Sequence, residues 1–217
     1  MDTVDTLSVM PIARKDGTHV LRLCVNQGLL TPDMVRKIMD VMTKYALPSL
    51  RATTGQRFNL EGIPSDKVDE IAAALGTPVD KCPPGVSVCP GGDQCKYGMQ
   101  DTRAMGDALL DLIKANGPYP FKIKSGVSGC AMACGLSFVR DVGLVGGAKG
   151  WNVYYGGAAN RHACTGIVLG KKVSKAEALE SIAKGLTYYK ENAKKFERIG
   201  AMVRRLGRDV VAAALTE

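Results

Sequence analysis

Two pairs of cysteines with fixed spacing constrain the fold of this 217-residue chain more than any other feature. The first pair is Cys89 and Cys95, with five residues between them, and the second is Cys130 and Cys134, with three. Both pairs lie in stretches of small residues, "CPGGDQC" and "SGCAMACG", where the backbone can bend around a compact object. The fold must bring two such loops to one place if the four sulfurs are to act together.

Four thiolates from two loops suit an iron–sulfur cluster, which takes four sulfur ligands and neighbouring N–H donors. Structural zinc is an alternative, although its cysteines usually lie about two to four residues apart. Disulfides and unrelated buried cysteines are the others. Seven cysteines is an odd number for a disulfide framework, which favours reduced thiols or metal ligation. Cys24, on an expected strand, is interpreted as core packing, and Cys82 and Cys164 receive no role.

The N-terminal part of the chain has the pattern of a ferredoxin-like unit. Its expected elements are a strand over 18–25, a helix over 31–45, strands over 49–54 and 56–63, and a helix over 65–76. Thr31 is the expected N-cap of the first helix and Pro32 its first residue, while Ser65 caps the second helix and Gly76 ends it. This βαββα order makes up most of a ferredoxin-like unit.

A stretch dense in Pro, Gly and Cys follows over 77–98. We then expect a helix over 99–115, a strand over 120–126, strands over 141–147 and 151–157, and two amphipathic C-terminal helices. The predicted fold class is therefore α+β, with a ferredoxin-like half domain over 1–76 and a mixed α/β domain with C-terminal helices over 77–217.

The charge balance points to an anionic partner, because 29 Lys and Arg face 21 Asp and Glu. The basic residues of the last third alternate with apolar ones at helical spacing, and no nucleic-acid recognition motif accompanies them, so nucleic acid is not expected. No apolar run reaches the ~18 residues of a membrane span. The acidic N-terminus does not resemble a secretory signal, which favours the cytoplasm.

The cysteine pairs and their flanks resemble the siroheme-dependent nitrite and sulfite reductases. The similarity lies in "CPGGDQCKYGMQD", "KSGVSGCAMACG" and "VRDVGLVGGAKGWNVYYGG", with "LRATTGQRFNLEGIP" upstream. It runs over about 18–157, and the short chain is most similar to the low-molecular-weight, assimilatory-type sulfite reductases. Full-size members hold two copies of the unit, whereas this chain has one, which leaves both a monomer and a homodimer open.

The resemblance implies two cofactors, a [4Fe-4S] cluster on Cys89, Cys95, Cys130 and Cys134, and a siroheme. It also implies that Cys134 bridges one cluster iron to the siroheme iron. On this interpretation Ala131, Ala133 and Gly135 are small because a flat macrocycle lies against that sulfur. Siroheme carries about eight carboxylates, which need charged partners when buried. The basic residues from which these partners would come are Arg22, Lys96, Arg103, Arg140 and Arg161.

Lys122 and Lys124 are the expected substrate ligands. As neighbours two apart on a strand they would point the same way, and two like charges there favour an anion between them. They also resemble the family's Lys-x-Lys segment. Relatives often carry an arginine where Gly55 stands, so Arg57 or Arg51 is expected to supply that charge.

The function expected from the resemblance is six-electron reduction of sulfite to sulfide, with an electron donor on a separate redox protein. Reduction of nitrite to ammonia is the alternative within the family. A non-catalytic [4Fe-4S] electron carrier is the alternative from another class.

Overall fold

The computed structural model describes residues 7–216. Residues 1–6, part of the segment judged not to be a secretory signal, lie outside this range. The chain divides into two compact units, one ending at Pro83 and one beginning at Pro84. The sequence-based division after residue 76 stays a prediction about separately folding domains.

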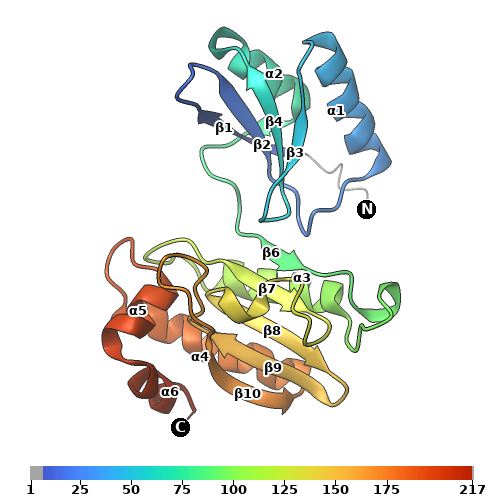
Figure 1. Cartoon of the computed structure of the whole chain (residues 1–217). Coiled ribbons are helices and arrows are strands. Elements are labelled where there is room, and N and C mark those ends of the chain that lie inside the picture. The colour runs from blue at the N-terminus through green and yellow to red at the C-terminus, as the bar shows by residue number, and fades with distance from the viewer. Residues whose placement is uncertain (1–6, 217) are drawn as a thin grey trace. The chain divides into compact units, whose positions relative to one another are not determined.

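The first unit is one five-stranded sheet with two helices (Figure 1). Its elements are β1 (Ser8–Ala13), β2 (His19–Leu23), α1 (Pro32–Lys44), β3 (Leu50–Ala52), β4 (Phe58–Ile63), a 3-10 turn η1 (Ser65–Lys67), α2 (Val68–Leu75) and β5 (Thr77–Pro78). The strand order is β3-β4-β2-β1-β5, antiparallel except for the parallel β1–β5 pair. The fold class predicted from sequence is confirmed.

Local signals position α1 well and α2 less well. The Thr31 hydroxyl accepts from the backbone N–H of Met34, and Pro32 is the first helical residue, as predicted. Ser65 does not cap α2, because its hydroxyl donates to the carbonyl of Gly17 at 2.6 Å and the chain first makes a 3-10 turn. The Ser65 hydroxyl is therefore used in a contact with a residue 48 positions away and does not form the helix cap that the sequence had predicted.

The sequence analysis missed strand β1. Its pattern is weakened by Pro11, which cannot donate to a sheet ladder. Partners on both sides still hold this strand, because β1 pairs antiparallel with β2 and parallel with β5. Sheet pairing with residues far along the chain overrides the local pattern.

The second unit is a mixed sheet with strand order β10-β9-β8-β7-β6. Its strands are β6 (Val86–Val88), β7 (Ser125–Ser128), β8 (Val142–Gly147), β9 (Gly150–Tyr155) and β10 (Ile167–Val173). Its helices are α3 (Thr102–Ala115), α4 (Lys175–Asn192), α5 (Ile199–Leu206) and α6 (Arg208–Thr216), with 3-10 turns η2 (Gly92–Gln94) and η3 (Ser137–Val139). β6, β7 and β8 run parallel, and β9 and β10 continue antiparallel.

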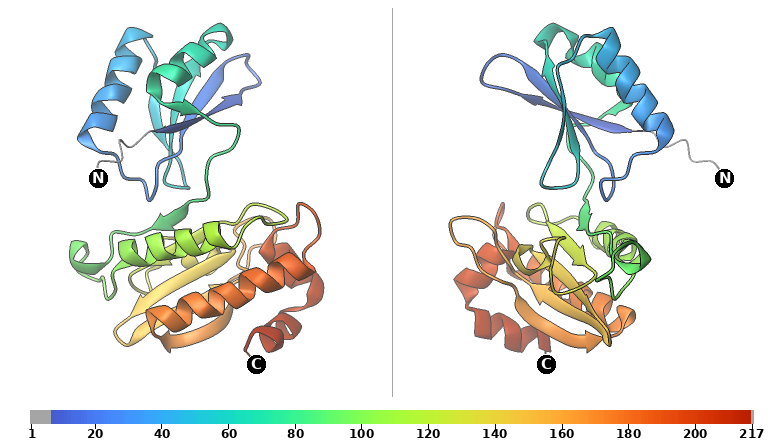
Figure 2. Two further views of the ribbon diagram at one scale, coloured as in Figure 1. Left: turned by 180° about the vertical axis from the view of Figure 1, so that it is seen from behind. Right: turned by 45° about the vertical axis from the view of Figure 1, so that its right-hand side comes forward.

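Helices α3 and α4 lie side by side on one face of this sheet, α3 over β6 and β7 and α4 over β9 and β10 (Figure 2). The core between them contains fully buried Met105, Leu144 and Tyr155. The loops that follow β6 and β7 leave the sheet at one edge, because these two strands are parallel neighbours. That edge carries the candidate site.

Three details of this unit differ from the prediction. Helix α3 begins at Thr102, because Asp101 is its N-cap and accepts from the N–H of Ala104. Strand β10 was not predicted, and two shifts in its register against β9 explain why its alternation is weak. Three helices follow it, and Gly207 separates the last two. Across residues 7–216, no helix is long and apolar enough to cross a membrane.

Candidate functional site

The two cysteine pairs follow two neighbouring parallel strands. Cys89 comes directly after β6, and Cys130 comes two residues after β7. Val88 and Val127 are paired in the register of these strands, so both loops leave the sheet at the same edge. Loops at the carboxyl ends of adjacent parallel strands are a common place for binding sites. This topology brings together segments that are about forty residues apart in sequence.

Hydrogen bonds join the first loop to the second. The N–H of Cys89 donates to the carbonyl of Val127 at 3.1 Å, and the N–H of Met99 donates to the carbonyl of Gly129 at 2.9 Å. The N–H of Gly129 in turn donates to Sγ of Cys89 at 3.1 Å. Backbone N–H donors to sulfur are the groups that stabilise cluster thiolates.

The buried Thr102 side chain closes the first loop onto α3. Its hydroxyl donates to the carbonyl of Cys89 at 2.8 Å. Gly91 has φ +51°, and a Cβ there would lie 2.3 Å from Oγ1 of Thr102. Only glycine fits this turn, because the conformation is left-handed and the side chain of Thr102 occupies the space.

The second loop is a tight coil after β7. The N–H of Gly135 donates to the Ser128 hydroxyl at 3.0 Å, and a Cβ on Gly135 would lie 2.4 Å from the carbonyl oxygen of Val127. Gly135 therefore has to be small because the loop folds back on β7, a reason within the protein itself. The resemblance had attributed its small size to a macrocycle.

Cys134 is the exposed thiol of the four, while Cys89, Cys95 and Cys130 are partly buried. Beside it in the loop, the side chains of Met132 and Leu136 are 74% and 44% exposed. This combination places an exposed thiol among apolar groups that face solvent.

Within residues 7–216, no three His, Cys, Asp or Glu side chains are grouped tightly enough to hold a single metal ion. In the same range five thiols are free, namely Cys89, Cys95, Cys130, Cys134 and Cys164. Cys164 lies in another loop, where its backbone forms an isolated bridge with Ala158. The donor set at the edge of the sheet, four free thiols on two joined loops with an N–H directed at one sulfur, has the chemistry of an iron–sulfur ligand set.

Lys122 and Lys124 do not lie on a strand, which corrects the prediction. Strand β7 begins at Ser125, and residues 122–124 are irregular. The carboxylate of Asp141 accepts from the N–H of Lys124 at 2.7 Å, while the carbonyl of Lys124 accepts from the N–H of Val142 in β8 at 3.3 Å, so a side chain replaces a neighbouring strand only on the donor side of this residue. Both lysines are nevertheless exposed, and Lys122 lies over the ring of Phe121.

A buried carboxylate organises the cations around this segment. Asp141 is 1% exposed and accepts from Nε of Arg198 at 2.9 Å. Although Lys124 is exposed, partial desolvation of its ammonium group lowers its pKa, and the nearby charges of Arg198, Arg140 and Lys122 lower it further. Burial also lowers the pKa of Arg140. Lys124, Arg140 and Arg198 lie near this one buried acid, and Lys122 is close to Lys124, so positive charge is in excess here and favours an anion.

Sequence reasoning missed Asp141 and Arg198. A usable signal for Asp141 was its place immediately before the apolar run of β8, where an ionised side chain is buried only if it is paired. Arg198 gave no comparable signal, because it is the N-cap of α5 and meets Asp141 across 57 residues.

The remaining basic candidates of the second unit have individual settings. Arg140 is 9% exposed and donates to the Ser87 hydroxyl at 3.4 Å. Arg103 donates to Oε1 of Gln94 at 2.8 Å, in the first cysteine loop. Lys96 lies over the ring of Tyr97, and Arg161 is exposed in the loop after β9.

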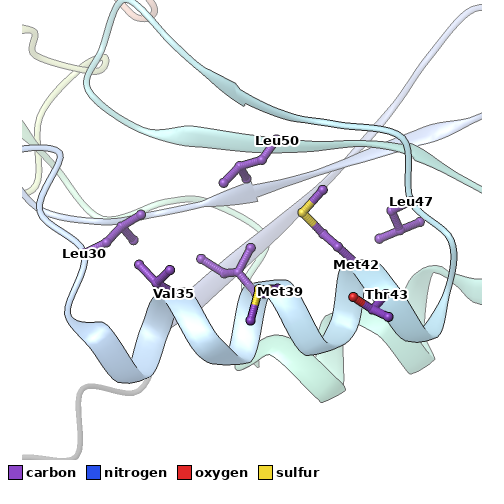
Figure 3. A pocket seen from close by; sticks show the side chains of 8 residues that line it. Leu30, Val35, Met39, Met42, Thr43, Leu47 and Leu50 are labelled. Carbon is purple, nitrogen blue, oxygen red and sulfur yellow. The ribbon is translucent and has the colours of Figure 1, made fainter.

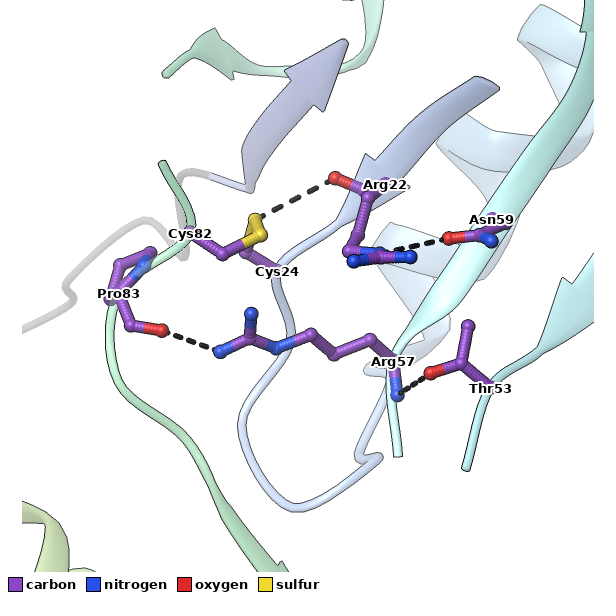
Figure 4. Close-up of a disulfide and its surroundings, with 7 residues drawn as sticks. All are labelled: Arg22, Cys24, Thr53, Arg57, Asn59, Cys82 and Pro83. Atoms are coloured by element: carbon purple, nitrogen blue, oxygen red, sulfur yellow. Dashed lines mark hydrogen bonds between the residues drawn. A yellow bond between two sulfur atoms is a disulfide. The ribbon is translucent and has the colours of Figure 1, made fainter. Parts of the chain in front are cut away.

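In the first unit, Arg22 and Arg57 lie near one another (Figure 4). Arg22 donates to Oδ1 of Asn59 at 3.1 Å, and Arg57 donates to the carbonyl of Pro83. Burial lowers the pKa of Arg57, and the charge of Arg22 lowers it further. Arg51 differs, because its Nε lies 2.9 Å from Oε1 of Glu61.

Cys24 and Cys82 form a disulfide beside these arginines, with Cα atoms 5.5 Å apart (Figure 4). The interpretation of Cys24 as core packing, and the expectation that this pair is reduced, were therefore wrong. Strand β5 pairs with β1, and the N–H of Val79 donates to the carbonyl of Val9. Strand β1 is also paired with β2, which ends one residue before Cys24. The pairing of β5 with β1 therefore brings the segment that carries Cys82 back toward the end of β2.

Comparison with known families and proteins agrees with this geometry. Residues 80–217 match the family described as "Nitrite and sulphite reductase 4Fe-4S domain", and residues 12–77 match "Nitrite/Sulfite reductase ferredoxin-like half domain". Both units of the chain are therefore matched by parts of the same kind of protein.

Curated relatives point the same way. The chain is 36% identical over 192 residues to an assimilatory-type sulfite reductase of Nitratidesulfovibrio vulgaris, covering 87% of this chain and 88% of that protein. It is 33% identical to a nitrite reductase [NAD(P)H] of Bacillus subtilis, covering 94% of this chain but only 26% of that longer protein. Among solved structures, the NirA protein of Mycobacterium tuberculosis has the same fold, with a TM-score of 0.73, 21% identity, and coverage of 93% of this chain and 40% of that one.

Proposed function

Because the chain belongs to the family of nitrite and sulfite reductases, we propose that it reduces sulfite to sulfide with six electrons. The cofactors of this family are a [4Fe-4S] cluster and siroheme. When bound, the cluster and the siroheme would relay electrons from a donor and supply the iron at which the anion is reduced. Cys89, Cys95, Cys130 and Cys134 would hold the cluster, and Cys134 would be shared with siroheme.

The observation that carries this proposal is the joining of the two cysteine loops at the edge of the parallel strands. The N–H of Gly129, next to Cys130, donates to Sγ of Cys89. Such a donor stabilises a thiolate carrying part of a cluster's negative charge. A backbone donor of the second loop therefore reaches a sulfur of the first loop, which supports a role for the two loops as one ligand set.

The surroundings of Cys134 support its assignment as the shared ligand. Its thiol is exposed, and the neighbouring Met132 and Leu136 expose apolar side chains. A flat macrocycle covering them would remove apolar surface from water, at about 25 cal/mol per Å². The carboxylates at the rim of the macrocycle would take partners from Arg22, Lys96, Arg103, Arg140 and Arg161.

The cations around Asp141 provide the anion site in this proposal. Lys122 and Lys124 donate hydrogen bonds to the oxygens of the bound anion, and the carboxylate of Asp141 holds the Lys124 backbone in place. A bound anion would offset the mutual repulsion of these cations, because it brings negative charge to a region where positive charge is in excess.

Lys124 also acts as a proton donor in this proposal. Its lowered pKa makes the ammonium group a stronger acid, and the oxygens that leave sulfite must take up protons. Arg57 is the first candidate for a substrate-binding arginine. Arg51 remains the second candidate, with its charge balanced by Glu61.

The size match favours sulfite over nitrite. The chain covers 88% of the assimilatory-type sulfite reductase, whereas the nitrite reductase is a much longer protein of which it covers 26%. A separate redox protein delivers the electrons in this proposal, and the reaction takes place in the cytoplasm.

Substitution of the two lysines tests the assignment. Lys122→Ala and Lys124→Ala should each leave the absorption of the bound cofactors unchanged and lower kcat/KM for sulfite about a hundredfold, since each removes a close charge from the anion. The matched control is Lys171→Ala on β10, an exposed lysine outside the cation cluster. It should leave turnover unchanged.

Each other outcome contradicts a stated part of the proposal. Unchanged turnover in both lysine variants would remove the anion site from this segment. A higher kcat/KM for nitrite than for sulfite would reassign the substrate. Anaerobically purified protein without a chlorin-type band in the red, showing only broad cluster absorption, would favour the electron carrier.

A further inference from the structure

The Cys24–Cys82 disulfide joins the end of a strand to an irregular segment. Cys24 directly follows β2, and its N–H donates to the carbonyl of Ser8 at 2.9 Å, so strand β1 holds its backbone. Cys82 lies within residues 79–85, which form neither helix nor strand between β5 and β6. The N–H of Val79, at the start of this segment, still donates to β1. The disulfide therefore fixes a later part of the segment on the same sheet.

Arg57 reaches this segment from another strand. Leu23 and Phe58 are paired at the ends of the antiparallel strands β2 and β4. Cys24 and Arg57 are the next residues beyond this pair, so both lie at one end of the sheet. The guanidinium of Arg57 donates to the carbonyl of Pro83, which directly follows the second cysteine of the disulfide (Figure 4). A covalent bond and a hydrogen bond thus hold two successive residues of the segment.

We propose that this disulfide is a redox switch that sets the position of the Arg57 side chain. The reductant is a dithiol: one of its thiolates attacks a sulfur of the disulfide, the S–S bond breaks, and a mixed disulfide forms. The second thiol of the reductant then displaces the protein sulfur, which leaves two protein thiols and one oxidised dithiol, with the two protons on the protein sulfurs. Once Cys82 is released, the carbonyl of Pro83 is no longer held at Arg57. This inference rests on the proposed role of Arg57 in binding the substrate.

The setting of the disulfide favours reversible exchange. Cys24 is partly exposed, so a small dithiol has access to this end of the sheet. Arg22 and Arg57 lie beside the disulfide (Figure 4), and positive charge stabilises the thiolate that leaves when an S–S bond breaks. After reduction, the hydrogen bond of Val79 to β1 keeps Cys82 close to Cys24, so exchange with an oxidised dithiol restores the bond.

The orientation of Arg57 matters for an anion because a guanidinium has several N–H donors in a fixed geometry. In the oxidised state, the carbonyl of Pro83 accepts from one terminal nitrogen and orients the group, so its other N–H groups can meet an anion. In the reduced state, the side chain regains rotamer freedom that anion binding has to remove again. Ordering one such side chain weakens binding about threefold to tenfold. Reduction should therefore raise KM for sulfite by that factor and leave kcat nearly unchanged.

Limited trypsin digestion of the holoprotein tests the release of the segment without measuring activity. Lys81 is exposed and directly precedes Cys82. Cleavage after Lys81, followed on reducing gels, should be at least about fivefold faster in protein that a small dithiol has reduced. Cleavage after Lys195, an exposed residue in the irregular loop between α4 and α5, should not change.

Two variants accompany the digestion. Cys82→Ser cannot form the disulfide, so it should be cut after Lys81 at the fast rate with or without the dithiol. Met39→Ser is the matched control in the same unit. Met39 is 59% exposed and lines an apolar groove of about 480 Å³ between α1 and β3 (Figure 3). This variant should respond to the dithiol as the wild type does.

Kinetics identify Arg57 as the residue that responds. KM for sulfite is measured with oxidised and with reduced wild type, and a thiol count after the assay verifies that the electron donor has left the disulfide intact. Arg57→Ala should show the same KM in both states, because the responding side chain is gone. Arg51→Ala removes an arginine that pairs with Glu61, and it should still show the rise in KM on reduction.

Three results overturn the switch. Equal cleavage after Lys81 in both redox states means that the disulfide does not hold the segment. An equal KM in both states of the wild type means that the segment does not control substrate binding. A rise in KM that persists in Arg57→Ala means that the segment acts through another residue. Protein without turnover of sulfite in either state would overturn the proposed function and the role of Arg57 with it, and the digestion would still report the release of the segment.

Discussion

Replacing Asp141 by Asn should destabilise the second unit strongly. The Asp141 side chain is 1% exposed and accepts from Arg198 through Nε and a terminal nitrogen, and from the backbone N–H of Lys124. Asparagine keeps the shape of the side chain but removes its charge and leaves it a single acceptor oxygen. The guanidinium of Arg198 would then lose its ionic partner.

Removing one partner of a buried ion pair costs about 3–5 kcal/mol. The lower end applies here, since the Arg198 side chain is 29% exposed and keeps some contact with water. A loss of about 3 kcal/mol corresponds to a fall in Tm of roughly 6–12 °C for a protein of this size. Asp111→Asn is the matched control, because it removes the same charge from an exposed position of α3.

Thermal melting of the holoprotein measures the effect, and a double-mutant cycle assigns it. Combining Asp141→Asn with Arg198→Gln should cost at least about 1 kcal/mol less than the sum of the two single variants, because the double variant leaves no unpaired charge. The reasoning fails if Asp141→Asn melts within about 2 °C of wild type, or if the two losses simply add.

Three further predictions follow from other contacts. Cys24→Ser should lower the free energy of unfolding by about 4 kcal/mol, because the Cys24–Cys82 disulfide spans 58 residues; denaturation with and without reductant measures this, and equal curves for wild type would contradict it. The Arg205 side chain lowers the pKa of Glu197, so the pair contributes stability above the usual carboxyl pKa and loses it as pH falls through the lowered value. Glu197→Gln should therefore be less stable than wild type at pH 7, with the difference shrinking below about pH 4.5, and a constant difference would be inconsistent with it. Gly135→Ala should cost about 1–3 kcal/mol through overpacking against the carbonyl of Val127, 2.4 Å from the added Cβ, and unaltered melting would exclude that contact.

Helices with strong local signals were predictable. Thr31 and Pro32 place the start of α1, because a cap and a fixed φ act within one turn of the chain. Strands β8 and β9 follow from their apolar runs. Lys122 and Lys124 show the limit of this reasoning. Their segment alternates like a strand, yet the carboxylate of Asp141, seventeen residues away, takes the Lys124 N–H instead of a neighbouring strand.

The amino-acid sequence alone determined the excess of positive charge and the α+β class, and it indicated the four cysteines that are proposed to hold the cluster. Spacing, composition and periodicity are local properties, and they can be read without knowing which residues meet. Only the tertiary structure decided that β6 and β7 are neighbours, that Cys24 reaches Cys82, and that α1 leaves an apolar groove beside β3. Each of these depends on contacts between residues far apart in the chain, whose free energy exists only once the sheets have formed.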